Sequence, residues 1–186
     1  MKRVFDTIFS VMALVVFGLP MILIALAVKL TSRGPALYWS DRVGRDNIIF
    51  KMPKFRTMSP DTPAVATHLL TDPNLHITPL GRVLRKSSLD ELPQLLSILK
   101  GDMSFVGPRP ALFNQYDLIA LRTAKGVQHI MPGLTGWAQV NGRDDLSIPV
   151  KVDLDEYYLK NKSLFLDIII LGMTAFQALG AKGVTH

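Results

Sequence analysis

Two adjacent carboxylates in a short motif are the residues of this sequence best suited to chemistry. Asp90 and Glu91 lie in the segment SSLDELPQ, residues 87–94. Ser88 and Glu91 have the spacing of a capping box. With Ser88 as the N-cap, Pro93 would be the fifth helical residue, where the backbone N–H normally donates a hydrogen bond that proline cannot make. A start with Asp90 as the N-cap is therefore favoured, because Pro93 then falls where no donor is required.

Asp90 has a structural and a functional interpretation at such a helix start. As a cap, it would contribute about 1 kcal/mol, and this is the commoner role when the motif is considered alone. As a functional group, a carboxylate at a helix N-terminus stays ionised, and anions with a bridging cation can assemble there.

Basic residues around the motif strengthen the functional interpretation. Lys54 and Arg56 lie upstream, Arg85 lies just before the motif, and Arg109 follows it between two prolines. The prolines restrict the backbone of Arg109, which a residue needed only for solubility would not require. Because the planar guanidinium group matches phosphate oxygens, these side chains predict a site for phosphate esters.

A second pair of carboxylates suggests a different reaction. Asp153 and Asp155 match the D-x-D pattern of metal-dependent sugar-nucleotide enzymes, which would make the protein a direct glycosyltransferase that releases UDP. Such triplets often arise by chance. The four histidines are scattered and cysteine is absent, which excludes thiolate zinc sites and cysteine nucleophiles. Nucleotide-binding glycine loops and serine-hydrolase motifs are also missing.

The composition indicates one domain with an affinity for anions and for membranes. The chain has 186 residues, 48% of them hydrophobic and only 19% charged, below the roughly 25% usual in soluble domains. Its net charge of +6 suits phosphate esters, acidic lipid or nucleic acid. A membrane-anchored nucleic-acid-binding protein is disfavoured, because no recognised binding module is present.

The elements that must position these residues begin with an apolar stretch from Ile8 to Val28. As one helix it would be about 31 Å long and would match a hydrocarbon core of about 30 Å. A spanning helix and a re-entrant hairpin are both compatible with it, and a secretory signal fits less well because the run is too long. Pro20 in the interior and basic residues on both flanks, Lys2 and Arg3 before it and Lys29 after it, favour the hairpin. An ion pair with Arg3 is the expected role of Asp6.

The rest of the chain is predicted to be mainly helical. Helices are expected from Thr78-Pro79, over 114–125, and over 164–179, where the helix is apolar enough to lie in a membrane interface. Residues 36–60 have weak strand character, and residues 59–79 are expected to form an irregular loop.

The ordered motifs together resemble the bacterial sugar transferase family, the monotopic phosphoglycosyl transferases, over nearly the whole chain. The matching segments are KRVFD (2–6), the proline-broken apolar stretch, KFRTM (54–58), LRKSSLDELPQ (84–94), GDMSFVGPRP (101–110), PGLTGW (132–137), 155–158 and 163–167. The resemblance is to the minimal form, without additional transmembrane helices in front.

The resemblance implies a reaction and a site. Members of this family move a phosphosugar from a UDP-sugar to undecaprenyl phosphate and release UMP, the first membrane step of glycoconjugate biosynthesis, such as that of exopolysaccharide or O-antigen. The family's aspartate nucleophile maps onto Asp90, and Glu91 is its partner. Mg²⁺ is required, and Asp90 and Glu91 are the expected ligands. Lys54, Arg56, Arg85 and Arg109 are expected to contact the diphosphate.

The resemblance also implies an architecture. The fold class is α/β, helix-dominated, with a small β-hairpin or sheet. Residues 1–33 would form a re-entrant helix-break-helix anchor with its break at Pro20 and with Lys2 and Arg3 at its start. Residues 34–186 would form a cytoplasmic catalytic domain with interfacial helices, on the inner membrane. The sugar and the formation of a homodimer are left open.

Overall fold

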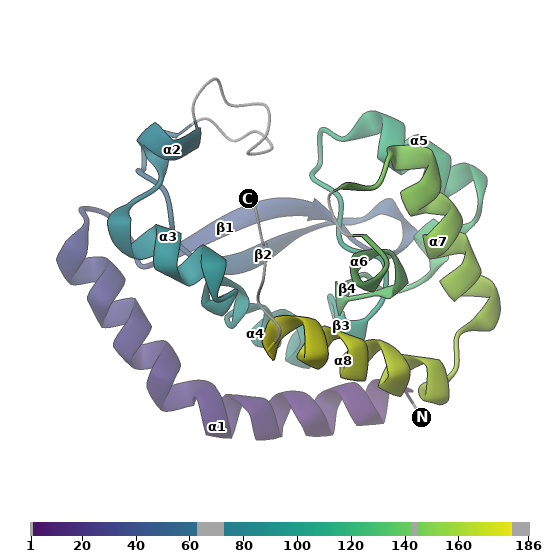
Figure 1. The fold of residues 1–186 in the computed structure, drawn as a ribbon, viewed down its shortest axis with the longest axis horizontal. Coiled ribbons are helices and arrows are strands. Elements are labelled where there is room, and N and C mark those ends of the chain that lie inside the picture. Colours follow the sequence, from purple (N-terminus) through teal and green to yellow (C-terminus); the bar gives the residue numbers. More distant parts are fainter. Residues whose placement is uncertain (1, 63–72, 143–144, 180–186) are drawn as a thin grey trace.

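The computed structural model describes residues 2–62, 73–142 and 145–179. Helices dominate, and the strands form two separate two-stranded sheets (Figure 1). The elements in chain order are α1 (Lys2–Thr31), β1 (Leu37–Val43), η1 (Arg45–Asn47), β2 (Ile49–Phe55), α2 (Pro73–His76), α3 (Pro79–Lys86), η3 (Leu89–Glu91), α4 (Gln94–Lys100), β3 (Ser104–Val106), α5 (Tyr116–Ala124), η4 (Val127–His129), β4 (Gly133–Thr135), α6 (Trp137–Val140), α7 (Ile148–Asn161) and α8 (Leu164–Leu179). The helix-dominated α/β class with a small hairpin is thus confirmed.

Helix α1 is one continuous helix rather than two helices joined by a break. Pro20 lies inside it. Proline removes one backbone hydrogen bond and its ring crowds the preceding turn, so it bends a helix without necessarily ending it. Figure 1 shows this bend as two arms of α1 that meet at an angle along the lower edge of the molecule. The expected helix-break-helix is therefore corrected to a bent helix.

Both ends of α1 are attached to the rest of the protein. At its start, Lys2 pairs with Asp167 of α8, and the Arg3 guanidinium donates to the carbonyl oxygens of Ile98 and Leu99 at the end of α4. Just beyond its other end, the carbonyl and hydroxyl oxygens of Ser32 accept hydrogen bonds from Arg56.

Asp6 does not form the ion pair with Arg3 that its spacing suggests. Its carboxylate is buried and accepts a hydrogen bond from the backbone N–H of Phe105 at 3.2 Å, while Arg3 is occupied at α4. The side chains diverge because each finds a backbone partner on a different element. Asp6 therefore fastens α1 to β3.

The predicted strand character of residues 36–60 is realised as an antiparallel hairpin. Leu37 pairs with Phe55 at one end and Val43 with Ile49 at the other. At the turn, Asp46 and Asn47 have left-handed backbone conformations with φ of 55° and 59°. Asp and Asn tolerate this conformation better than most residues, so the turn chemistry is encoded locally.

The second sheet holds the segment that leads to the proline-flanked Arg109 against β4. Strands β3 and β4 are parallel, with Ser104 opposite Gly133. A Cβ on Gly133 would lie 2.1 Å from the backbone nitrogen of Gly107, so only glycine permits this approach. The segment that follows Gly107 is thereby held against the core.

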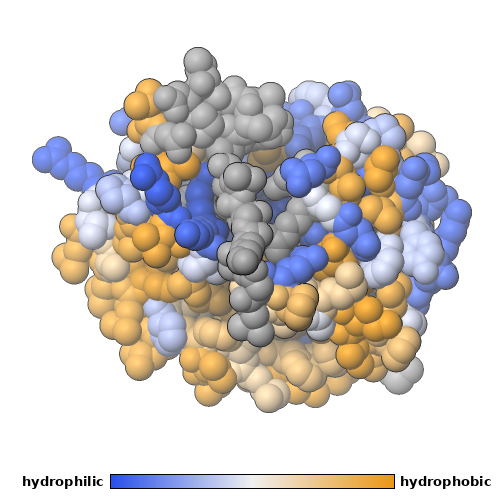
Figure 2. Space-filling model, in the orientation of Figure 1, coloured by the Kyte–Doolittle hydropathy of each residue, from blue (hydrophilic) through white to orange (hydrophobic). Residues whose placement is uncertain are grey.

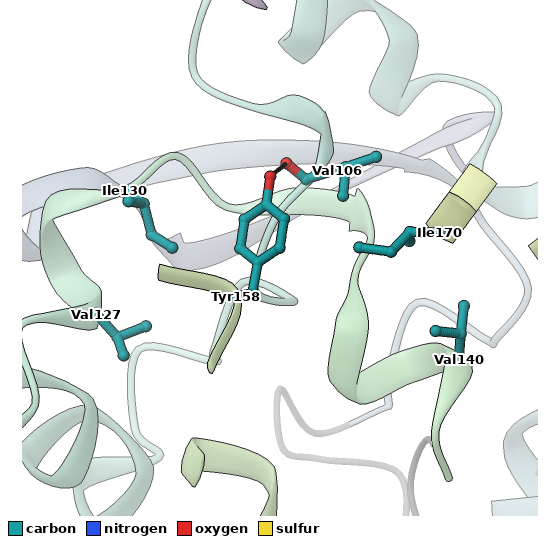
Figure 3. Packing of buried hydrophobic residues seen from close by; sticks show 6 residues of the cluster. All are labelled: Val106, Val127, Ile130, Val140, Tyr158 and Ile170. Carbon is teal, nitrogen blue, oxygen red and sulfur yellow. Dashed lines mark hydrogen bonds between the residues drawn. The ribbon is translucent and has the colours of Figure 1, made fainter. Parts of the chain in front are cut away.

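A buried cluster supports this second sheet. Val106, Val127, Ile130, Val140, Tyr158 and Ile170 pack together, as Figure 3 shows. The Tyr158 hydroxyl lies 3.2 Å from the carbonyl oxygen of Val106, the contact dashed in Figure 3, and 2.6 Å from the carboxylate of Asp167. Its polar atom is therefore satisfied within the core, as buried hydroxyl groups require.

Several predicted helix boundaries are confirmed. The Thr78 hydroxyl accepts a hydrogen bond from the Gly81 N–H, with Pro79 in the first turn of α3. Predicted helices at 114–125 and 164–179 correspond to α5 and α8. In the expected loop 59–79, residues 73–76 form α2, and residues 63–72 lie outside the described part of the chain.

One side of the molecule is apolar. Figure 2 shows hydrophobic residues gathered over α1 along the lower edge, below a more hydrophilic upper part. The exposed residues of α1 include Val15 at 79% and Leu30 at 84%, and those of α8 include Phe165 at 74% and Phe176 at 79%. Apolar exposure on this scale is typical of a surface that contacts membrane or another protein.

Candidate active site

The two adjacent carboxylates lie in the short 3-10 turn η3, before α4 begins. Ser88 precedes this turn in a left-handed conformation, with φ of 56°, and makes no side-chain cap. Helix α4 starts later, with Pro93 at its N-cap. The expected capping roles of Ser88 and Asp90 are therefore wrong, because the left-handed residue and the proline place a separate turn between α3 and α4.

Glu91 is held by two cations from distant parts of the chain. Lys54 Nζ on β2 lies 2.7 Å from Oε1 of Glu91, and Arg109 Nη2 lies 2.8 Å from the same oxygen. Burial alone would raise the pKa of Glu91, but the charges and hydrogen bonds of Arg109 and Lys54 outweigh it and hold that pKa well below its usual range. Glu91 is therefore a fixed anion.

Asp90 differs from Glu91 because the nearby positive charges do not outweigh the effect of burial on the pKa of its carboxyl group. The residue is 8% exposed. Burial raises the pKa of its carboxyl group, Glu91 raises it further, and the charges of Lys54, Arg85 and Arg109 only partly offset this. A carboxylate with a raised pKa is more basic than usual, and such perturbed groups are typical of functional sites.

Lys54, Arg85 and Arg109 converge on the two carboxylates, as the sequence predicts. Arg85 Nε donates a hydrogen bond to the Thr57 hydroxyl at 2.9 Å, which orients its guanidinium while its charge acts on Asp90. Burial lowers the pKa of Lys54, partly offset by Glu91. These three side chains form a cationic wall beside the carboxylates.

Arg56 is not part of this wall. Its Nε donates to the carbonyl oxygen of Pro35, its Nη2 donates to Ser32, and the residue is 5% exposed. Arg56 follows the last residue of β2, and its guanidinium is occupied by oxygens of the segment between α1 and β1, whereas Lys54 pairs with Glu91. The expected contact of Arg56 with the diphosphate is corrected to a structural role at the end of α1.

Two arginines that the sequence did not single out support Arg109 and its neighbours. Arg42 Nη1 donates to the carbonyl oxygen of Pro110 at 3.1 Å, and Arg122 Nη1 donates to that of Arg109 at 2.8 Å. Burial, followed by the charge of Arg109, lowers the pKa of Arg42 to about 10. The chain has 21 Lys and Arg residues, and no motif distinguishes these two.

The D-x-D pair does not form a metal site. Asp153 lies at the surface, 2.6 Å from Lys125 Nζ, whereas Asp155 is 1% exposed and 2.6 Å from Arg122 Nη2. Residues two apart on α7 point in different directions, and each carboxylate has its own cation. The expectation that Asp153 and Asp155 act together as metal ligands is therefore corrected.

A cavity of about 380 Å³ adjoins the carboxylates. Its lining includes Glu91 and Arg109 as well as residues from α1 and α8. Its volume is within the range of roughly 300–1,000 Å³ that ligand sites usually have. The arrangement thus combines a basic carboxylate, a fixed anion, three cations and an adjoining cavity.

Comparison with known proteins places this arrangement in a family. The model for "bacterial sugar transferase" matches residues 1–181, so the chain belongs to the bacterial sugar transferase family. An uncharacterised sugar transferase, EpsL, of Bacillus subtilis is 38% identical over 184 residues, which cover 99% of this chain and 90% of that protein.

Two longer relatives have names that state a reaction. The undecaprenyl-phosphate galactose phosphotransferase of Salmonella typhimurium is 38% identical over 202 residues, covering 98% of this chain and 41% of that protein. The undecaprenyl-phosphate glucose phosphotransferase of Komagataeibacter xylinus is 40% identical over 188 residues, covering 93% of this chain and 35% of that protein. The chain therefore spans less than half the length of each.

Proposed function

We propose that this protein transfers a phosphosugar from a UDP-sugar to undecaprenyl phosphate and releases UMP. The observation that carries the proposal is the carboxylate pair, in which Lys54 and Arg109 fix Glu91 while Asp90 keeps a raised pKa beside them. The named relatives act on undecaprenyl phosphate, which supports the choice of acceptor.

Asp90 acts as the nucleophile in this proposal. Its carboxylate oxygen forms a bond to the phosphorus that carries the sugar, and the bond from that phosphorus to the oxygen of UMP breaks. The resulting acyl phosphate is then attacked by a phosphate oxygen of undecaprenyl phosphate, which restores the Asp90 carboxylate. Two half-reactions allow the soluble donor to leave before the lipid is used.

The cationic wall supplies the charge stabilisation that phosphoryl transfer requires. Negative charge on the oxygens of the transferred phosphoryl group must be neutralised while Asp90 attacks, and positioned positive charges do this. Arg85 and Arg109 face the diphosphate as planar donors, and Lys54 acts as a compact charge. The ion pairs of Glu91 with Arg109 and Lys54 keep both cations in position beside Asp90.

The donor atoms of the site fit a Mg²⁺ ion that arrives with its substrate. Within the described ranges, no group of three or more acidic, histidine or cysteine side chains is positioned to hold a metal. Mg²⁺ usually binds one or two carboxylates together with substrate phosphates. Asp90 and Glu91 would provide the protein ligands, and the ion would neutralise charge on the diphosphate.

The attachment of α1 supports a re-entrant anchor on the cytoplasmic face of the inner membrane. A helix of 30 residues would be about 45 Å long if straight, enough to cross a bilayer. However, Lys2 and Arg3 at its start and Ser32 beyond its end all contact the same catalytic body. A spanning helix would place those ends on opposite sides, so the bend at Pro20 and the exposed apolar face fit a helix that enters and returns.

A nucleotide assay tests the proposal directly. The purified protein is incubated with Mg²⁺, undecaprenyl phosphate and a panel of UDP-sugars, and released UMP and UDP are separated by chromatography. UMP release that requires the lipid acceptor, with at least one sugar, is expected. Release of UDP with direct transfer of the sugar would contradict the proposal and revive the glycosyltransferase alternative.

A further inference from the structure

The cavity beside the carboxylates is lined by both charged and apolar residues. Glu91, Arg109 and Lys151 are among its charged lining residues, and Phe17, Leu171 and Ala178 are among its apolar ones. The three charged residues come from η3, the segment after β3, and α7. The three apolar residues come from α1 and α8, the two helices with exposed apolar faces.

The residues that α1 and α8 contribute to the lining belong to the surface that the proposed function places against lipid. Phe17 is 40% exposed and Ala178 is also exposed, although both line the cavity. A molecule in this space would therefore contact both Glu91 and the two lipid-facing helices. Such a shape selects an amphiphile with an anionic head and an apolar chain.

We propose that this cavity binds the phosphate-proximal isoprene units of a polyprenyl phosphate acceptor, with Lys151 drawing the acceptor phosphate towards Asp90. The inference rests on the proposed function and adds the path by which the acceptor enters. A volume of about 380 Å³ is near the lower end for ligand sites, so only the first part of the tail is enclosed. The remainder stays in the bilayer between α1 and α8.

The first test introduces a bulky side chain among the apolar lining residues of the cavity. Ala178→Trp inserts an indole at the cavity lining, and Ala175→Trp is the matched control, because Ala175 is exposed on the same helix and does not line the cavity. Two reactions are measured: labelling of the protein by a donor radiolabelled in the sugar, without lipid, and transfer from donor to undecaprenyl phosphate.

Ala178→Trp is expected to raise the acceptor KM by about tenfold or more, as steric exclusion from an apolar pocket does, and to leave donor-only labelling at the wild-type rate. Ala175→Trp is expected to match wild type in both reactions. The same rise is expected with the short acceptor farnesyl phosphate, because the enclosed units are those next to the phosphate.

The second test removes the positive charge of Lys151 from the cavity lining. Lys151→Gln is compared with Lys160→Gln, which neutralises an exposed lysine on the same helix α7. Loss of one charge-assisted contact is expected to raise the acceptor KM about tenfold for Lys151→Gln, with an unchanged rate of donor-only labelling.

The outcomes separate this inference from the proposed function. Absence of donor-only labelling in the wild-type protein would reject the covalent mechanism itself. Normal labelling with an unchanged acceptor KM in both Ala178→Trp and Lys151→Gln would overturn the acceptor path alone. A loss of donor-only labelling in Ala178→Trp would assign the cavity to the nucleotide donor instead. If Ala178→Trp raised the acceptor KM only for undecaprenyl phosphate and not for farnesyl phosphate, the phosphate-proximal units would be excluded as the part of the tail that binds here.

Discussion

The guanidinium of Arg122 is bonded to the main chain of Arg109, whose own guanidinium is bonded to Glu91. Arg122 Nη1 lies 2.8 Å from the carbonyl oxygen of Arg109, and Arg109 Nη2 lies 2.8 Å from Oε1 of Glu91. Asp155 in turn binds Arg122 through Nε and Nη2. A buried ion pair therefore fixes the backbone from which an active-site cation extends.

Loss of the Asp155 carboxylate should destabilise the protein strongly. Asp155→Asn leaves the buried Arg122 charge without its partner, and breaking such a pair costs about 3–5 kcal/mol. Asp153→Asn is the matched control, since its exposed contact with Lys125 contributes about 0–1 kcal/mol. Thermal unfolding in detergent compares the two variants. Equal Tm values for both would contradict the role given to the buried pair.

Asp90→Asn should abolish the covalent intermediate. An amide has no anionic oxygen to attack the phosphorus, so labelling of the denatured protein by a sugar-radiolabelled donor is expected to fall to background. Asp41→Asn, a change on the exposed hairpin strand β1, should label like wild type. Retained labelling of Asp90→Asn would remove this residue from the role of nucleophile.

Glu91→Gln should weaken turnover without preventing folding. The neutral amide would no longer hold Lys54 and Arg109 through charge, and contacts to charged groups are worth about 1.5–3 kcal/mol each. A fall in kcat/KM of roughly 10- to 100-fold is expected in the UMP assay. A fully active variant would show that the two cations keep their positions without the carboxylate.

Removal of Mg²⁺ should stop the reaction but leave the fold intact. The described residues hold no cluster of three metal-ligating side chains, so the ion is expected to bind with the donor rather than to support the structure. EDTA should abolish UMP release, and added Mg²⁺ should restore it, while the Tm of the substrate-free protein stays constant. A large drop in Tm with EDTA would instead point to a structural metal.

Epitope tags at the two termini should both face the cytoplasm. The start of α1 and the residue after its end contact the same catalytic body, which is incompatible with a straight crossing. Protease accessibility in intact spheroplasts and in inverted vesicles distinguishes the two sides. Tags found on opposite sides would establish a spanning helix and exclude the re-entrant anchor.

Local signals in the sequence predicted the elements and much of the site. The Thr78-Pro79 helix start, the apolar helix at 164–179 and the placement of Lys54, Arg85 and Arg109 around Asp90 and Glu91 were all anticipated. The helix start and the apolar run follow from short-range rules of capping and hydropathy. The site residues followed from the family motifs, which carry information about distant contacts.

Contacts between distant segments were not predictable in the same way. Arg42 and Arg122 donate hydrogen bonds to main-chain carbonyl oxygens, which every residue possesses. No pattern of side chains in the sequence therefore predicts these contacts. Arg56 shares a motif with Lys54, yet its buried guanidinium binds Pro35 and Ser32. Asp6 reaches Phe105, 99 positions away, rather than the nearby Arg3.

The two-point attachment of α1 has a consequence for how deeply the enzyme sits in lipid. A helix fastened at one end only could tilt or slide independently of the catalytic body. Here Lys2 and Ser32 both form contacts with the rest of the protein, so α1 is attached at both ends to the part of the fold that carries Asp90. In the proposed topology, the height of Asp90 above the acyl chains is therefore built into the fold, and bilayers of different thickness would have to adjust to the protein.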